Sequence, residues 1–425
     1  MWELNTTLDI WCFFLQYRLE KTFREVDPNL LRRPRMLEST RAAGALECGD
    51  PARRDRFKSA DISVHSRGSR STTSRNNLIS HAIVFGFTLM SSVSAADLSP
   101  LSESQQKFIN GLAAKSRSAQ TENTAVIAGV DGWFFLSSDN RFLSVGQFWG
   151  ADAAKVSRAH KPESADPIPA IVDFHDQLKK RGIDLLFMPV PPKAAIYPEK
   201  ILADVDLHGE TAAPYLARFY DELRKREIDV VDLSPVFLQN RTNEHGPVFC
   251  KTDTHWSGFG CVLAAQAIKD KIHEKLAGQP GKDFAAEWKQ ITIKGDLSDL
   301  AGPKIKKPEP EKIAVRTISD KQTGAAINPD PSSPLLIIGD SHTLVFHDFL
   351  AEKSGLLDQL AYETGFAPDL IGTRGSGSTS VRISLYRRAR KDPDYLSKKK
   401  MIVWCFAARE FTESDQGWDK VPVGQ

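Results

Sequence analysis

Two short segments of the chain bring together residue types that can carry out nucleophilic catalysis. Residues 251–256 read KTDTHW and place Asp253 two positions before His255, and residues 339–342 read GDSH and place Ser341 directly after a short apolar run. A serine hydroxyl is a weak nucleophile until an imidazole accepts its proton, and a carboxylate holds that imidazole in the right tautomer. Asp253, His255 and Ser341 are therefore a candidate triad of orienting carboxylate, general base and nucleophile.

Each segment alone has a simpler explanation. The GDS turn also fits a capped helix start, in which Asp340 or Ser341 accepts a hydrogen bond from a first-turn N–H. The Asp253–His255 pair also fits a metal site, because carboxylate and imidazole ligate zinc, manganese or iron. The further ligand segments that two-metal phosphoesterases need are not evident in the sequence. The triad is therefore the better interpretation, and it requires no metal and no cofactor.

Basic side chains near the ends of apolar runs are candidates for binding substrate. Arg374 lies in the Gly/Ser-rich residues 372–380, and Arg409 follows the last apolar run. A guanidinium group is a fixed donor for a developing oxyanion or for a uronate carboxylate, although each arginine could instead be solvated or salt-bridged. Lys193 and Tyr197, after another apolar run, are expected to border the cleft.

Apolar runs and helical stripes alternate along the chain after residue 160. The patterns predict strands at 183–190, 230–233, 335–338 and 401–406, and helices at 103–116, 168–180, 215–226, 257–276 and 344–350. This alternation is typical of an α/β fold whose mostly parallel sheet carries helices on both faces, with its site at the carboxyl ends of the strands. The helix expected at 344–350 would point its N-terminus at Ser341. The Lys/Pro-rich residues 277–334 are interpreted as solvated loops and an edge hairpin.

The near-neutral net charge of +2 is the sum over three segments that differ in charge. Residues 1–75 hold 12 Arg and 2 Lys against 10 acidic residues, residues 76–96 hold no Asp, Glu, Lys or Arg, and the remainder is slightly acidic. Residues 78–95 form an apolar run that follows arginines and ends in Val-Ser-Ala, the layout of a secretory signal peptide. We interpret 1–75 as a doubtful leader from an over-extended reading frame, 76–96 as a signal peptide or membrane anchor, and 97–425 as the exported domain.

The balanced charge argues against a nucleic-acid partner, and the cysteines agree with export. Cys250 and Cys261 enclose a short loop, where a disulfide would stabilise the fold by about 3 kcal/mol. Cys405, inside an apolar run, is interpreted as a buried free thiol.

Four segments in order resemble the SGNH-hydrolase-like alginate O-acetyltransferases of the AlgX/AlgJ type. They are GVDGWFFL at 129–136, PVPPKAAIYPEK at 189–200, KTDTHW at 251–256 and IIGDSHT at 337–343. The resemblance implies an SGNH-like fold and a triad of Asp253, His255 and Ser341, in which Asp and His precede Ser, the reverse of ordinary SGNH esterases. His342 stands where an aromatic such as Phe is expected. The chain ends too soon after Arg409 for the C-terminal carbohydrate-binding module of the AlgX branch.

The resemblance implies a periplasmic O-acetyltransferase that moves an acetyl group through Ser341 onto hydroxyls of an exopolysaccharide such as alginate. A membrane-bound acyltransferase partner would supply the acetyl groups. Two alternatives stay open. Water attacking the same acyl-enzyme would make the protein an esterase or deacetylase, and a decayed site would leave a polysaccharide-binding scaffold.

Overall fold

The computed structural model describes residues 100–272, 275–276, 278–279 and 281–424. The chain separates into two units, Met1–Ser91 and Ser92–Gln425, and every described residue belongs to the second. The leader and signal-peptide predictions for 1–75 and 76–96 therefore lie outside the described residues. Among the helices of the described part, none is both long enough and apolar enough to cross a membrane.

A five-stranded sheet forms the centre of the described unit, and all its pairings are parallel. Its strands, in the order β4-β3-β9-β7-β8, are β4 (Asp229–Val230), β3 (Asp184–Val190), β9 (Met401–Ala407), β7 (Leu335–Gly339) and β8 (Asp369–Gly372). β7 and β9 are buried along their whole length, as expected for apolar runs covered on both faces. The predicted α/β fold with a mostly parallel sheet is confirmed.

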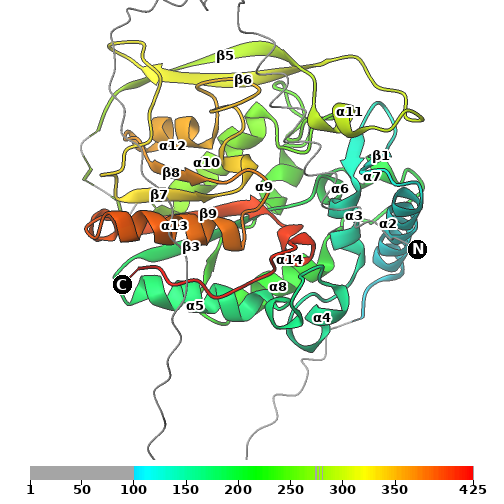
Figure 1. Cartoon of the computed structure of the whole chain (residues 1–425). Helices are drawn as coiled ribbons and strands as arrows, with labels where there is room; N and C mark the ends of the chain where they lie inside the picture. The colour runs from blue at the N-terminus through cyan, green and yellow to red at the C-terminus, as the bar shows by residue number, and fades with distance from the viewer. Residues whose placement is uncertain (1–99, 273–274, 277, 280, 425) are drawn as a thin grey trace, which may run out of the picture. The chain divides into compact units, whose positions relative to one another are not determined.

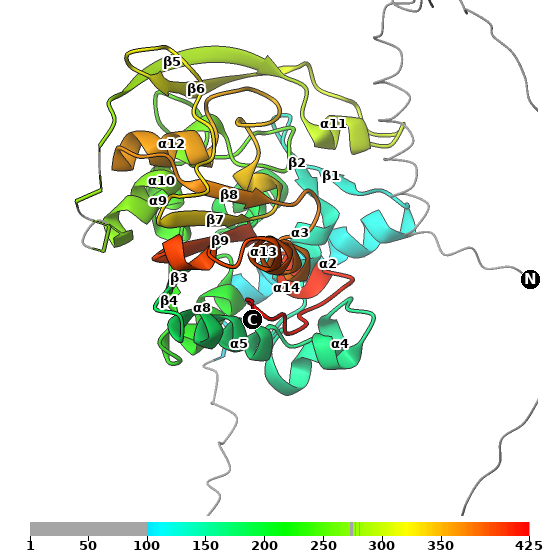
Figure 2. The ribbon, with the colours of Figure 1, turned by 60° about the vertical axis from the view of Figure 1, so that its left-hand side comes forward.

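Helices cover both faces of this sheet (Figures 1 and 2). On one face lie α5 (Pro167–Lys179), α8 (Pro214–Arg224) and α13 (Thr379–Lys391), and on the other lie α10 (Gly258–Ile272) and α12 (Leu356–Thr364). α5 shows why such helices form: Asp166 caps it by accepting the Ile168 N–H, and its apolar stripe of Ala170, Phe174 and Leu178 is buried.

An antiparallel ribbon lies outside α10 and α12 (Figure 1). It pairs β5 (Phe284–Ile293) with β6 (Glu311–Asp320) along ten residues and is separate from the central sheet. The hairpin predicted within 277–334 is therefore present as a sheet of its own.

A smaller group of elements precedes the first strand of the central sheet. It contains α2 (Glu103–Thr121), the hairpin of β1 (Val126–Ala128) with β2 (Phe134–Leu136), and α3 (Ser137–Ser144). Short helices fill the connections: α4 (Ala153–Val156), α6 (Lys193–Ile196), α7 (Pro198–Ile201), α9 (Ser234–Gln239), α11 (Asp296–Leu300) and α14 (Glu410–Glu413).

The strand register brings four carboxyl ends to one edge of the sheet. Val190 of β3 lies opposite Ala407 of β9, and Gly339 of β7 lies opposite both Cys405 and Gly372. The residues that follow these strands therefore emerge together, which is where open parallel sheets carry their sites.

The helix predicted at 344–350 is wrong. Only the 3-10 turn η4 (Ser341–Thr343) follows β7. The chain then folds back on itself, because Phe346 and Leu350 take left-handed backbone conformations (φ 63° and 66°) and the Phe346 N–H donates to the Phe349 carbonyl at 2.8 Å. Of the apolar residues that suggested a helix, Leu344, Val345 and Phe346 are buried in this loop instead.

The predicted Cys250–Cys261 disulfide is also wrong, because Cys250, Cys261 and Cys405 are free, buried thiols. The Cys250 Sγ is directed at the Trp256 carbonyl, 3.5 Å away, as part of its own loop, whereas Cys261 lies in the first turn of α10. Burial raises the pKa of both thiols well above the ordinary value, so both remain protonated. Cys405 is buried and free, as predicted.

Gly339 offers a test of the close approach between β7 and β9. A Cβ at this position would lie 1.8 Å from the Cys405 carbonyl oxygen, which is backbone and cannot move aside. Gly339→Ala is expected to lower the free energy of unfolding by about 1–3 kcal/mol or more in urea titrations. Gly302→Ala, where nothing lies within 4 Å of the added Cβ, is the control. Equal unfolding free energies for the two variants would contradict this packing.

Candidate active site

The segment 251–256 is a tight loop immediately before α10. A β-bridge pairs Phe249 with Trp256, and the Cys250 N–H donates to the His255 carbonyl at 3.2 Å. The Ser257 N–H closes the base of the loop by donating to the Val248 carbonyl at 2.9 Å. These bonds hold Asp253 and His255 at the loop tip with their side chains on the same side.

Asp253, His255 and Ser341 form a continuous hydrogen-bonded chain. The His255 Nδ1 lies 2.6 Å from the Asp253 Oδ1, and its Nε2 lies 2.8 Å from the Ser341 Oγ. Asp253 and His255 are 1% and 5% exposed, while Ser341 is partly exposed. The structure thus brings together the three residues that the sequence singled out, and His255 and Ser341 meet across 86 positions of chain.

The charges in this chain fix which atoms carry protons. Burial alone would raise the pKa of Asp253, but the charge and hydrogen bond of His255 and the N–H groups of Asp296 and His255 lower it to about 2. An ionised carboxylate only accepts, so the Nδ1 of His255 must carry hydrogen and its Nε2 is free to accept the serine proton. Burial lowers the pKa of His255, yet the Asp253 carboxylate outweighs burial and raises it.

Asp296, at the start of α11, is a second carboxylate beside the pair. Its N–H donates to the Asp253 Oδ2 at 2.9 Å, and its own oxygens accept the Thr254 N–H at 2.8 Å and the Thr254 hydroxyl at 2.6 Å. Burial and the nearby Asp253 charge raise the pKa of Asp296 to about 6. Asp296 therefore braces the loop tip from outside.

The nucleophile stands on a turn and not on a helix. Asp340 caps η4 by accepting the His342 N–H at 2.9 Å, and its other oxygen accepts the Ala407 N–H from β9 at 2.7 Å. Because no α-helix follows, the helix dipole that the sequence interpretation assigned to the oxyanion is absent from this segment. The same turn instead folds Phe349 back against the edge of the His255 ring, with 5.6 Å between ring centroids.

His342 forms a second Asp–His pair next to the first. Its Nδ1 lies 3.1 Å from the Asp340 Oδ1, and its ring centroid lies 4.8 Å from that of His255 and 5.3 Å from that of Trp256. Burial lowers the pKa of His342 and, with smaller contributions from the charges of His255 and Arg409, outweighs the charge and hydrogen bond of Asp340, which raise it. His342 is therefore a neutral ring packed against His255.

Arg374 lies against the Phe349 ring, next to His255. It is exposed, and its guanidinium carbon lies 4.6 Å from the centroid of the Phe349 ring that touches His255. Glu410 anchors the same loop by accepting the Ser376 hydroxyl at 2.9 Å and the Ser378 hydroxyl at 3.1 Å. The geometry is compatible with a cation that meets an incoming ligand.

Arg409 has the salt-bridged arrangement that the sequence left open. Its Nη1 lies 3.2 Å from the Asp139 Oδ1, and the charges of Asp139 and Asp340 outweigh burial and raise its pKa. Lys193 and Tyr197, expected to border the cleft, are both 3% exposed and lie in the interior.

Asp253, His255 and Asp296 are close enough to hold a metal ion, with ligand atoms within 4.8 Å of one another. Their lone pairs and protons are already engaged with one another, with Thr254 and with Ser341. A metal would have to displace one of these bonds, so the arrangement fits a proton relay better than a cation site.

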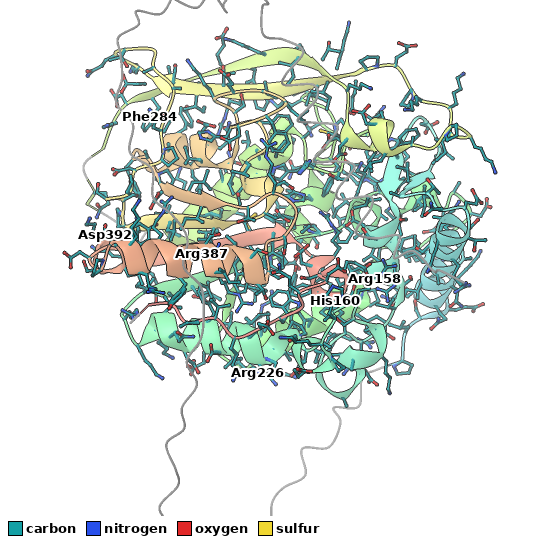
Figure 3. The ribbon with its side chains drawn as sticks, viewed as in Figure 1. Arg158, His160, Arg226, Phe284, Arg387 and Asp392 are labelled. Carbon is teal, nitrogen blue, oxygen red and sulfur yellow. The ribbon has the colours of Figure 1, made fainter. Side chains whose placement is uncertain are left out.

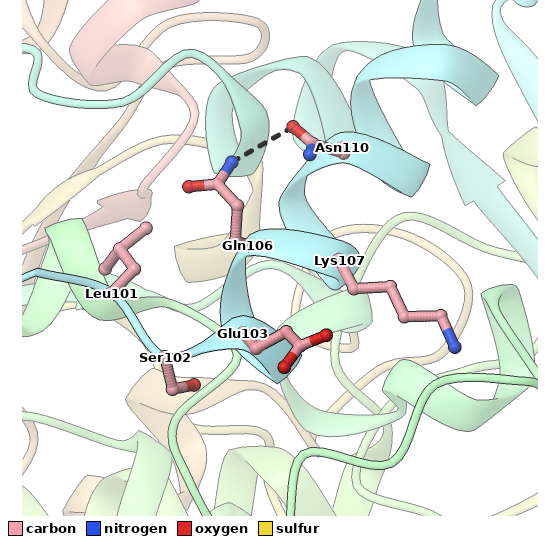
Figure 4. A pocket seen from close by; sticks show the side chains of 6 residues that line it. All are labelled: Leu101, Ser102, Glu103, Gln106, Lys107 and Asn110. Carbon is pink, nitrogen blue, oxygen red and sulfur yellow. Dashed lines mark hydrogen bonds between the residues drawn. The ribbon is translucent and has the colours of Figure 1, made fainter.

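Two surface hollows lie away from the triad. One follows the first turns of α2, where the Gln106 amide donates to the Asn110 Oδ1 at 3.0 Å (Figure 4). Another lies between α13 and the C-terminal segment. Neither is lined by Asp253, His255 or Ser341.

The sequence interpretation missed several residues that hold the site. Asp296, Glu311 and Phe349 reach it from other segments, and His342 packs against His255. The charged text around Asp296 and Glu311 resembles an ordinary surface loop, so the sequence offered no signal for them. The one signal for His342 was its adjacency to Ser341.

Known proteins are similar to this chain in sequence and in fold. The probable alginate O-acetylase AlgJ of Pseudomonas aeruginosa is 29% identical over 321 residues, which cover 69% of this chain and 73% of the relative. The alginate biosynthesis protein AlgX of the same species is 21% identical over 249 residues, covering 55% of this chain and 48% of AlgX. The solved O-acetyltransferase domain of Pseudomonas putida AlgJ superposes with a TM-score of 0.53 at 20% identity, over 69% of this chain and 94% of that domain.

The family model described as "SGNH hydrolase-like domain, acetyltransferase AlgX" matches residues 126–363. This range covers more than half of the chain and includes Asp253, His255 and Ser341, so the resemblance drawn from the four motifs is confirmed. The chain belongs to the family of SGNH hydrolase-like domains of the acetyltransferase AlgX.

Proposed function

We propose that the protein is an O-acetyltransferase that carries an acetyl group on Ser341 and passes it to a hydroxyl of an exopolysaccharide such as alginate. The observation that supports this most strongly is the buried chain from Asp253 through His255 to Ser341, with links of 2.6 and 2.8 Å, in a member of an acetyltransferase family. Its relatives are named as alginate O-acetylases.

The reaction has two similar halves. His255 takes the Ser341 proton on Nε2 while Oγ attacks the carbonyl carbon of the acetyl donor, and the intermediate then expels the leaving group, which takes the proton from His255. In the second half His255 takes the proton of a sugar hydroxyl as that oxygen attacks the acetyl carbon. The Ser341 oxygen then leaves and recovers the proton.

Each half passes through a negatively charged oxygen, which needs donors placed in advance. The backbone N–H of Ser341 is the proposed donor on the nucleophile itself. The imidazolium formed at His255 is stabilised by Asp253, whose low pKa keeps it ionised throughout. Each half of the reaction therefore needs only one proton, which moves onto the His255 Nε2 and off it again.

Arg374 is proposed to bind a carboxylate of the acceptor. Its guanidinium group lies over the Phe349 ring, and that ring packs against His255, so only the Phe349 side chain separates an exposed cation from the base. A uronate polymer carries one carboxylate on each sugar, and a guanidinium group binds carboxylates through paired hydrogen bonds. Arg409, engaged with Asp139, is assigned a structural role.

The proposed setting is the periplasm, with export or tethering through residues 76–96. The acetyl group would then come from a membrane-bound acyltransferase partner, because an activated acetyl donor made in the cytoplasm has to be relayed across the membrane.

The acyl-enzyme is tested by incubating the full chain with p-nitrophenyl acetate, with and without oligomannuronate, and locating acetyl groups by mass spectrometry. Acetyl is expected on Ser341 and on the sugar, and both signals are expected to disappear in Ser341→Ala and His255→Ala. Ser397→Ala, an exposed serine, is the control. EDTA is expected to change neither signal.

Other outcomes of this experiment favour the alternatives. Ester hydrolysis without acetylated sugar would make the protein an esterase. Loss of activity with EDTA would favour the metal interpretation, and binding of oligomannuronate without any acetyl on Ser341 would favour a scaffold.

The pH dependence follows from the Asp253–His255 pair. The base must be neutral, so kcat/KM is expected to rise with pH through the pKa of His255, which Asp253 raises. Asp253→Asn removes that charge, so the rise is expected to move to lower pH by about one unit or more, while the plateau falls by about 10²–10⁴-fold. Asp299→Asn, an exposed carboxylate of α11, should leave the profile unchanged. An unmoved rise in Asp253→Asn would contradict the assignment of the base.

The role of Arg374 predicts a specific change in KM. Arg374→Gln is expected to raise KM for oligomannuronate by about 10-fold, since a charge-assisted hydrogen bond contributes about 1.5–3 kcal/mol, and to leave p-nitrophenyl acetate hydrolysis nearly unchanged. Arg387→Gln, an exposed arginine of α13 (Figure 3), is the matched control. A KM equal to that of the wild type would remove Arg374 from the acceptor site.

A further inference from the structure

A buried lysine lies directly beneath the loop that carries Asp253. The Nζ of Lys193 donates to three backbone carbonyls: Asp253 at 2.6 Å, Phe134 at 2.9 Å and Lys251 at 3.3 Å. The residue is 3% exposed. A protonated ammonium has three N–H donors, and here each of them has one acceptor.

An ammonium in this place is costly. Removing it from water costs several kcal/mol unless hydrogen bonds and nearby charges compensate, and burial accordingly lowers the pKa of Lys193. Part of the compensation comes from Trp133 and Phe135, whose ring centroids lie 6.0 and 5.8 Å from Nζ. An apolar side chain would fill the same space without this cost. The presence of a charged group at this buried position therefore calls for a role beyond packing.

Glu311, at the start of β6, binds the same stretch of backbone through its N–H groups. The Lys251 N–H donates to both carboxylate oxygens, at 3.0 and 2.8 Å, and the Thr252 N–H donates to one of them at 3.2 Å. The carbonyls of residues 251 and 253 are thus held by a cation and the N–H groups of 251 and 252 by an anion. The positive charge of Lys193 thus lies at the negative, carbonyl ends of the peptide groups, and the negative charge of Glu311 lies at their positive, N–H ends.

We propose that Lys193 and Glu311 are positioning residues that fix the backbone of residues 251–253 and thereby aim the Asp253 carboxylate at His255. The inference rests on the proposed triad. In this assignment neither residue contacts substrate; both act through the loop. The two carbonyls that Lys193 binds on this loop belong to Asp253 itself and to the residue two positions before it.

The expected effect is on turnover. The Asp253–His255 contact is short, at 2.6 Å, and a shift of about 1 Å in such a group can cost about 10²-fold in rate. Lys193→Met is expected to lower kcat by about 10–100-fold with little change in KM, and Glu311→Gln by a smaller factor. Because both act on one loop, the double variant should lose less than the product of the single losses.

The charges also predict a signature that a purely structural role would not produce. His255 is faced by Asp253 in its own loop, by Asp296 of α11, and by Asp340 and His342 of the nucleophile turn, all of which both variants keep. In Glu311→Gln the lost anion and a displaced Asp253 both lower the pKa of His255, so the rise of kcat/KM should move to lower pH by about 0.3 pH unit or more. In Lys193→Met the lost cation and a displaced Asp253 act on that pKa in opposite directions, so this variant is judged by its kcat.

The test uses the full chain with p-nitrophenyl acetate as substrate. Titration with phenylmethylsulfonyl fluoride counts the folded sites that still present a reactive serine, so kcat is expressed per site. Lys289→Met, an exposed lysine of β5, is the matched control. A lower kcat per site in both Lys193→Met and Glu311→Gln, with a shift of the rise to lower pH in Glu311→Gln, supports the proposal.

Three results would overturn the inference: a kcat per site within twofold of the wild type in Lys193→Met, a rise that stays in place or moves to higher pH in Glu311→Gln, or losses that multiply in the double variant. If Lys193→Met fails to fold, the kcat and pH shift of Glu311→Gln decide alone. Full activity in Ser341→Ala or His255→Ala would instead refute the proposed triad, which separates the two failures.

Discussion

The interaction on which the rest of the site depends is the contact between the Asp253 carboxylate and the His255 imidazole. It is short and almost fully buried, so the ion pair formed when His255 takes a proton is shielded from water and strong. The same burial makes an unpartnered charge costly. Every neighbour of the pair is accordingly a donor, an acceptor or a ring: N–H groups on Asp253, the Ser341 hydroxyl on His255, and Phe349 and His342 against the imidazole.

The fold brings Ser341 and the Asp253–His255 pair together from two directions that meet at one edge of the sheet. β7 delivers Ser341 at its carboxyl end, where the register with β8 and β9 aligns the neighbouring loops. The loop before α10 belongs to no strand of that sheet, so its position depends on polar contacts with Lys193, Glu311 and Asp296. The sheet thus fixes the position of the nucleophile Ser341, and the loop, held by these polar contacts, fixes the position of the base His255.

How far the sequence predicts this arrangement depends on whether a feature is local. The strands at 183–190, 335–338 and 401–406 are long apolar runs, and the structure has them at nearly the same bounds. The helix predicted at 344–350 fails because Phe346 adopts a left-handed conformation that composition does not reveal. Lys193 and Glu311 lie about sixty positions from the loop they hold. Such contacts form only when the chain folds, and no spacing rule predicts them.

The two Asp–His pairs beside Ser341 show why similar residues take different states. The Asp253 Oδ1 lies 2.6 Å from the His255 Nδ1, and the charge of Asp253 raises the pKa of that ring. The Asp340 Oδ1 lies farther from the His342 Nδ1, at 3.1 Å, and the other Asp340 oxygen accepts the Ala407 N–H. Burial then prevails, and a protonated His255 at 4.8 Å would repel a second proton. In the proposed reaction only His255 can shuttle a proton, while His342 remains neutral and supports its ring.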